Sequence, residues 1–168
     1  MKIRAADLKD AATIAEIYNF YIENSHATFE IEIVTEEEMR RRVSEILKNY
    51  PFLVCEENRE IIGYAFVSPY KKRAAYRHSV EISVYIKNGM GGKSVGTILY
   101  QNLFSELKEK PIHAIIAGIS LPNEASVNLH EKFGFEKVAH FREVGFKFGR
   151  WIDVGYWEKI QKGRTASD

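Results

Sequence analysis

Hydrophobic side chains recur at helical spacing in four segments of the chain. Two of these segments have a capping residue in front of them: Asp7, and Thr35, where the run Thr-Glu-Glu-Glu resembles a capping box. Gly134 closes the last segment, as glycine commonly does at the end of a helix. The pattern predicts helices over residues 8–22, 35–47, 95–108 and 123–133.

Extended apolar or alternating runs fill most of the remaining chain. Three of them follow one another, with a hairpin turn expected at residues 57–59, and this arrangement indicates an antiparallel meander. The run from His113 to Ile119 is almost continuously apolar, which predicts a strand buried on both faces. The predicted strands are residues 3–5, 52–56, 60–68, 80–86 and 113–119, and two more around the turn Phe148-Gly149-Arg150.

The order of these elements places an antiparallel half before a half with crossover connections. It predicts an α/β (α+β) fold with a mixed, mostly antiparallel sheet of about seven strands, flanked by about four helices. A chain of 168 residues is about one domain by the usual size range, and we expect a single domain over residues 1–160. A polar tail, residues 161–168, follows it.

Charge and composition narrow the class of partner. The 24 basic and 23 acidic residues nearly cancel, so no overall field recruits nucleic acid or a membrane, and we expect a small-molecule partner. The N-terminal segment is charged throughout, unlike a secretory signal, and the apolar runs are far shorter than a membrane helix requires, so we expect a cytoplasmic protein. The single cysteine, Cys55, lies in an apolar run and is interpreted as a buried thiol.

A glycine-rich loop, KNGMGGKSVG at residues 87–96, stands between a predicted strand and a predicted helix. It matches only the end of a nucleotide-triphosphate loop, and Ser94 takes the place of the third glycine of a dinucleotide fingerprint. Its setting still favours anion binding, because backbone amides from Gly91 to Gly96 lie at a helix N-terminus and Lys93 adds a positive charge. The alternatives are a merely flexible loop and a nucleotidase, although a nucleotidase also needs an acidic Mg²⁺ site that the sequence does not offer.

Two further stretches carry polar groups toward this loop. In the strand before it, Glu81 alternates to the face opposite the apolar series, where it is either a solvated side chain or a general base. After the next strand, Asn123 and Ser126 stand at the start of a helix, and His130 follows on the same helix. A lone histidine is more commonly structural, so His130 is a candidate and no more on this evidence.

Taken together, these stretches resemble the acetyl-coenzyme A core of the GNAT N-acetyltransferase superfamily. Within it, the chain resembles the phosphinothricin and methionine sulfoximine acetyltransferase family over its length from residue 3 to about 158. The segments that carry this second resemblance are residues 17–19, 27–29, 63–65, 75–81, 117–119, 129–132 and 144–153.

The resemblance implies a GNAT fold with a splayed pair of strands at the acetyl-CoA site, and it assigns the loop to the pyrophosphate of acetyl-CoA. The loop departs from the superfamily pattern: Gly91 replaces an arginine or glutamine, and Ser94 replaces a glycine. No metal is expected. The residues implied for coenzyme binding are Ser83, Val84, Tyr85, Ile86, Gly91, Gly92, Lys93, Ser94, Val95, Gly96, Thr97, Asn123 and Ser126.

The resemblance also assigns chemistry. Because a free α-amine is mostly protonated near pH 7, Glu81 is expected to accept its proton as general base, directly or through a water. Backbone N–H groups around Val84 and Tyr85 would stabilise the carbonyl oxygen under attack. His130 occupies the position of a tyrosine that protonates the departing thiolate in many members, so it is the candidate general acid.

The expected acceptor is a small amino acid with a free α-amine and a carboxylate, such as phosphinothricin, methionine sulfoximine or methionine sulfone. The residues expected to bind it are Phe29, Lys71, Lys72, Arg73, Tyr76 and Glu81. Two alternatives stay open: an acetyltransferase for polyamines or protein N-termini, and an acyl-CoA sensor without catalysis. The family is commonly homodimeric, with Trp151, Tyr156 and Trp157 as candidate contact surface.

Overall fold

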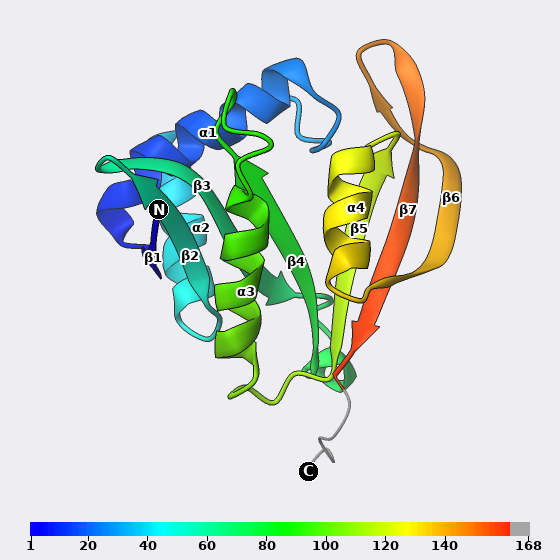
Figure 1. Ribbon diagram of the computed structural model, residues 1–168. Coiled ribbons are helices and arrows are strands. Elements are labelled where there is room, and N and C mark those ends of the chain that lie inside the picture. The colour runs from blue at the N-terminus through cyan, green and yellow to red at the C-terminus, as the bar shows by residue number, and fades with distance from the viewer. Residues whose placement is uncertain (162–168) are drawn as a thin grey trace.

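A computed structural model describes residues 1–161 as a seven-stranded sheet with helices on both faces (Figure 1). The strand order is β1-β2-β3-β4-β5-β7-β6, and every neighbouring pair is antiparallel except β4 with β5. The mixed, mostly antiparallel sheet predicted above is therefore confirmed. The strands are β1 (Lys2–Ala5), β2 (Phe52–Glu57), β3 (Glu60–Pro69), β4 (Ser79–Ile86), β5 (Ala114–Leu121), β6 (Glu136–Lys147) and β7 (Arg150–Ile160).

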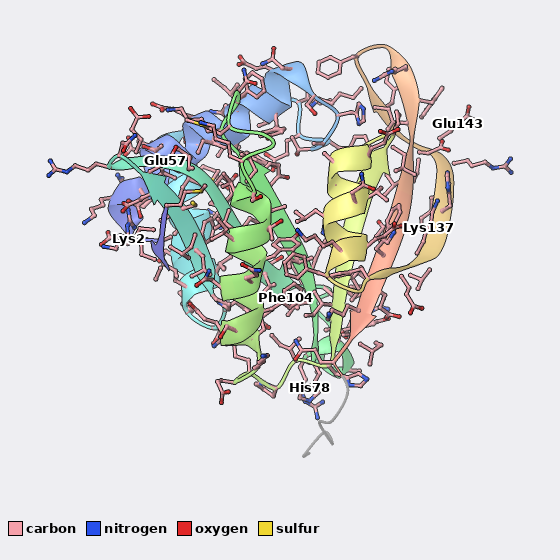
Figure 2. The ribbon with its side chains drawn as sticks, viewed as in Figure 1. Lys2, Glu57, His78, Phe104, Lys137 and Glu143 are labelled. Atoms are coloured by element: carbon pink, nitrogen blue, oxygen red, sulfur yellow. The ribbon has the colours of Figure 1, made fainter. Side chains whose placement is uncertain are left out.

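The helices form two layers, one on each face of the sheet. Helices α3 (Val95–Leu107) and α4 (Glu124–Lys132) cover the front face in Figure 1, and α1 (Ala11–Asn24) and α2 (Glu36–Leu47) cover the back. Alternate strand residues serve the two layers: Ala65 and Ile82 pack under α3, whereas Tyr64 packs under α1 and α2. Phe104 of α3 stacks on Phe133 between α3 and α4 (Figure 2).

Two helix starts differ from the prediction in detail. Asp7 caps a short 3-10 helix, η1 (Leu8–Asp10), and α1 begins after it. The Asp10 side chain accepts from the backbone N–H of Asp7 and from Arg4, and these bonds fix the tight turn. Thr35 caps α2 as predicted, but Glu38 pairs with Arg41 and Arg42 rather than returning to the cap, so only half of the expected capping box forms.

Both predicted hairpin turns are confirmed. Asn58 and Arg59 join β2 to β3 with φ of 51° and 68°, and Phe148 and Gly149 join β6 to β7 with φ of 51° and 72°. Left-handed conformations at both central positions suit the twist of an antiparallel pair. Of the predicted tail, residues 161–168, only Gln161 lies within the described residues, and its N–H donates to the carbonyl of His113 at 2.8 Å.

Two burial predictions need correction. Strand β5 is buried along most of its length, but Gly118 is exposed. Trp157, expected on a contact surface, is only 2% exposed and packs in the core under α4, with its indole N–H donating to Glu131. Trp151 is on the surface, at 62% exposed. Residues 151 and 157 differ by an even number and so lie on the same face of β7, but α4 covers Trp157, whereas Trp151 lies beside the start of α4, near the hairpin end, where it stays open to solvent.

The two central strands, β4 and β5, are paired at one end only. β4 pairs with β5 only from Ser79 to Glu81, against Ala114 to Ile116. Beyond Glu81 the strands diverge, and Figure 1 shows them opening upward between α3 and α4. This divergence is the splayed pair expected from the resemblance, and it places β4 at the wall of an opening in the sheet.

Candidate functional site

Two cavities adjoin along β4. One, of about 400 Å³, lies where β4 and β5 diverge, and we call it the splay cleft. The other, of about 510 Å³, lies on the opposite face under α2, and we call it the α2 cavity. Ser83 and Tyr85 line both of them. Strand β4 is thus a shared wall that two different molecules can approach from opposite sides.

The splay cleft has a backbone-rich wall and a polar rim. Residues 82–86 of β4 line one side, and within residues 1–161 they have no pairing with β5. The Tyr21 hydroxyl donates to the Ile86 carbonyl at 2.6 Å, and the remaining backbone groups on that side are available to an elongated ligand, because a strand pairs through both edges. The opposite side includes Asn123 and Ser126 at the start of α4, where the Asn123 side chain accepts from the Ser126 N–H at 3.1 Å. Six of the predicted coenzyme-binding residues therefore line this cleft: Ser83, Val84, Tyr85, Ile86, Asn123 and Ser126.

The other predicted coenzyme residues lie in the loop between β4 and α3 (Gly91 to Ser94) and in the first turn of α3 (Val95 to Thr97). Gly91, Gly92, Lys93 and Ser94 are exposed there, whereas Val95 is buried. Ser94 caps α3 in a left-handed conformation without a side-chain bond, so the first N–H groups of α3 point out of the helix end. Gly92 has φ of +78° with open space around it, and Gly96 has a packing role, because a Cβ there would lie 3.1 Å from Leu129.

Glu81 lines the α2 cavity, two residues before Ser83 and on the same face of β4. Burial raises the pKa of its carboxyl above the ordinary value. The structure gives this carboxyl no cationic partner among the described residues, so desolvation acts unopposed. Glu81 Oε1 lies 3.5 Å from the point where a Cβ at Gly118 would stand, and the ring of Tyr156 borders the same point at 3.3 Å. A carboxylate of raised pKa, facing open space, is suited to accept a proton.

His130 lines the splay cleft but is only 3% exposed. Its Nδ1 lies 2.8 Å from the carbonyl oxygen of Ser126, and its Nε2 lies 2.8 Å from the hydroxyl of Tyr100. Since a carbonyl only accepts, Nδ1 carries the proton and Nε2 accepts from Tyr100. Burial lowers the pKa of the imidazole, which favours this neutral form. Both ring nitrogens are therefore already engaged.

Apart from Glu81, the predicted acceptor-binding residues fall outside both cavities. Lys71, Lys72 and Arg73 are exposed in the connection from β3 to β4, and Tyr76 packs edge-on against Tyr70. This connection adjoins the end of β4 that carries Glu81. Phe29 lies in the segment after α1, where its ring leaves no room for a side chain at Gly145: a Cβ there would come within 2.3 Å.

A polar network at the far end of the α2 cavity was not anticipated from the sequence. The Tyr18 hydroxyl donates to Glu30 at 2.9 Å, and Arg42 donates to both oxygens of Glu30 at 2.7 and 3.2 Å. These residues come from α1, α2 and the segment between them, so no local pattern joins them.

A second unanticipated group lies between the segment after α1 and the C-terminal half of the sheet. His26 lines the splay cleft, with Nδ1 3.1 Å from the hydroxyl of Ser120, and Lys147 is buried nearby at 5% exposed. A histidine among polar neighbours and a lysine at the end of a strand rich in charged residues give no sequence signal of these roles.

Residues 1–161 lack two kinds of feature, a metal-binding cluster and a membrane-spanning helix. No cluster of three or more His, Cys, Asp or Glu side chains has an arrangement suited to a metal ion. Likewise, none of the helices in this range has both the length and the hydropathy required to cross a bilayer.

Comparison with known proteins gives consistent matches. The Acetyltransferase (GNAT) domain family matches residues 3–155. The phosphinothricin N-acetyltransferase of Streptomyces coelicolor is 39% identical, over 95% of this chain and 95% of its own length. The L-methionine sulfoximine/L-methionine sulfone acetyltransferase of Salmonella typhimurium is 36% identical, over 100% of this chain and 99% of its own. An acetyltransferase structure from Salmonella typhimurium, solved with its cofactor acetyl-CoA, superimposes with a TM-score of 0.96 at 35% identity, covering 100% of this chain and 98% of that one.

Proposed function

The chain belongs to the acetyltransferase (GNAT) family, and from this premise we propose that it transfers the acetyl group of acetyl-CoA to the α-amine of a small amino acid. The proposed acceptors are of the phosphinothricin, methionine sulfoximine or methionine sulfone type, as the names of its relatives suggest. The observation that carries this proposal is the meeting of two cavities at Ser83 and Tyr85 of β4, with Glu81 on the wall of the α2 cavity beside them. We treat residues 1–160 as one catalytic domain.

The residues of the splay cleft fit acetyl-CoA. The unpaired edge of β4 offers amide and carbonyl groups to the pantetheine, which itself carries amides. The exposed N–H groups at the start of α3, with Gly92 and Lys93 beside them, fit its pyrophosphate. Acetyl-CoA supplies the activated acetyl thioester, and the part of the chain is to bind and orient it. The loop holds its glycines where close backbone approach is required.

Glu81 is proposed as the general base. Its raised pKa keeps the carboxylate basic enough to take a proton from the acceptor amine, and its position on the wall of the α2 cavity separates it from the cleft that binds the coenzyme. The amine, once neutral, reaches the thioester across β4 near Ser83 and Tyr85. Direct transfer in a ternary complex follows from this two-sided arrangement.

His130 is proposed as the general acid that protonates the departing thiolate. Its ring lines the cleft, but Nδ1–H donates to Ser126 and Nε2 accepts from Tyr100. Donation to a thiolate therefore requires exchange of one of these bonds for a bond to sulfur. For the acceptor carboxylate, the exposed cations Lys71, Lys72 and Arg73 beside the Glu81 end of β4 remain the proposed partners.

We also propose a homodimer in the cytoplasm. Large apolar side chains are exposed together on the β6–β7 hairpin, which is unusual for a surface facing water only. They are Val138, Phe141, Val144, Phe146, Phe148 and Trp151. A C2 dimer would bury this face against its copy.

The test is a thiol-release assay with acetyl-CoA across amino acids, polyamines and N-terminal peptides, with Glu81→Gln as the matched inactive variant. We expect turnover with phosphinothricin, methionine sulfoximine or methionine sulfone. Preference for polyamines or peptides would replace the acceptor class. Binding of acetyl-CoA by calorimetry without turnover on any acceptor would favour an acyl-CoA sensor instead.

A further inference from the structure

Lys147, the last residue of β6, holds its ammonium group inside the protein. The side chain is 5% exposed, and Nζ donates to the carbonyl oxygens of Ser25 at 2.8 Å and Thr28 at 2.9 Å, with that of Tyr21 at 3.5 Å. All three acceptors are backbone groups, from a segment more than a hundred residues earlier in the chain. An ammonium has three donors, and each is used here.

These carbonyls lie at and just after the end of α1. Helix α1 ends at Asn24, so the Tyr21 carbonyl belongs to its last turn, where the helix dipole is negative; it already accepts from the Ser25 N–H at 3.1 Å, and the closer acceptors of Lys147 are the carbonyls of Ser25 and Thr28 beyond the helix. A cation from a distant strand thus caps this helix and fixes the direction in which the chain leaves it. In Figure 1 the tip of the β6–β7 hairpin stands beside this segment.

The segment held in this way, residues 25–30, contributes to both cavities. Ser25, His26 and Ala27 line the splay cleft, and Glu30 lines the α2 cavity. A second contact with β6 supports it: the ring of Phe29 lies directly over Gly145, where a Cβ would come within 2.3 Å. Lys147 and Gly145 therefore hold the same segment from the same strand, one through polar bonds and the other through close packing.

We infer that Lys147 is a positioning residue, which anchors residues 25–30 between the two cavities and thereby places Phe29 and Glu30 on the acceptor side. This inference rests on the proposed function for its effect on catalysis, but the anchor itself does not. The ammonium acts only through the segment, so its loss displaces groups that line the cavities without removing any of them. The glycine-rich loop and the start of α4 do not contact Lys147, so most of the coenzyme contacts are left in place.

The test compares Lys147→Met, which keeps the aliphatic length, with Gly145→Ala, which disturbs Phe29 and leaves the ammonium intact. Lys137→Met is the matched control, because Lys137 is an exposed lysine on the same strand (Figure 2). Amide hydrogen exchange over residues 21–34 reports the anchor, and steady-state kinetics with acetyl-CoA and the acceptor report its effect on the site.

For both test variants we expect faster exchange confined to residues 21–34 and a KM for the acceptor raised at least about tenfold, with a smaller change in the Kd of acetyl-CoA. The control should match the wild type. Wild-type exchange and KM in the test variants would overturn the inference. So would exchange that rises across the whole chain while kcat falls and KM stays unchanged, because Lys147 would then serve stability alone. If the segment loosens but the wild-type protein acetylates no acceptor, the anchor stands and the proposed function fails.

Discussion

The bond between Tyr100 and His130 allows a prediction of defined size. Tyr100 is fully buried and His130 is 3% exposed, and the hydroxyl lies 2.8 Å from Nε2. Because Nδ1–H is committed to the Ser126 carbonyl at 2.8 Å, the lone pair of Nε2 has the Tyr100 hydroxyl as its donor. Tyr100→Phe removes this single oxygen and leaves the ring packing against Phe104 and Phe133 in place.

The cost follows from the acceptor that is left behind. A buried acceptor without a partner costs about 1–3 kcal/mol of unfolding free energy. For a domain of this length, 1 kcal/mol corresponds to a change in Tm of about 2–4 °C, so Tm should fall by about 2–12 °C. In the double variant with His130→Leu, both polar partners are gone, and the combined loss should be smaller than the sum of the single losses.

Urea unfolding at pH 7.5 gives the four free energies of this double-mutant cycle, and an unchanged m value checks that the denatured state is comparable. Thermal unfolding provides the same comparison independently. A Tyr100→Phe protein as stable as the wild type, or a coupling energy of zero, would show that Nε2 does not depend on this hydroxyl. The assignment of the ring tautomer would then be wrong.

Other predictions concern the proposed site. Glu81→Gln should lower kcat about 10²–10⁴-fold with little change in acetyl-CoA binding, and a wild-type kcat would exclude Glu81 as the general base. The same variant should have a higher Tm at pH 8, because the pKa of Glu81 is raised in the folded protein and its ionised carboxylate lowers stability at pH values above that pKa. Gly92→Val should raise the KM for acetyl-CoA, whereas Gly89→Val, with a similar φ of +80° outside the coenzyme residues, should not; equal effects would indicate backbone strain alone. Burial lowers the pKa of His26 and His130 below the ordinary 6.5, so the unfolded chain binds more protons than the folded chain as the pH falls, and Tm should drop from pH 7 to 5. Replacing both histidines by Asn should make this drop in Tm smaller. An unchanged drop would show that other groups cause it.

Most of the fold could be predicted from the sequence because its signals are local. Alternation and helical spacing set each element, and left-handed turn positions such as Asn58 mark the hairpins. The details of the helix starts differ from the prediction where a tertiary contact determines the local structure. Arg4 binds Asp10 in the short helix before α1, and Arg42 binds Glu38, which therefore does not return to the cap of α2. The prediction of Trp157 on the surface is wrong because the position of α4 over β7 is a tertiary feature that the strand sequence does not reveal.

The site residues, like the fold, fall into those that local sequence signals identify and those that only tertiary contacts reveal. Glu81, Asn123 and Ser126 lie at element ends or faces that the pattern and the resemblance identify, and the structure brings them to the walls of the two cavities. The role of Lys147 could not be predicted, because its partners are backbone groups more than a hundred residues away. The network of Glu30 with Arg42 could not be predicted either, because it joins side chains of separate segments that no local pattern links.

The short pairing of β4 with β5 has a mechanical consequence. Within the sheet, the N-terminal and C-terminal halves of the protein are joined by three residue pairs, from Ser79 to Glu81 with Ala114 to Ile116. An elongated ligand bound farther along the opening would contact both halves at a distance from these three pairs, and would therefore restrict rotation of one half against the other. A ligand that fills the opening would therefore also stiffen the connection between the two halves of this chain.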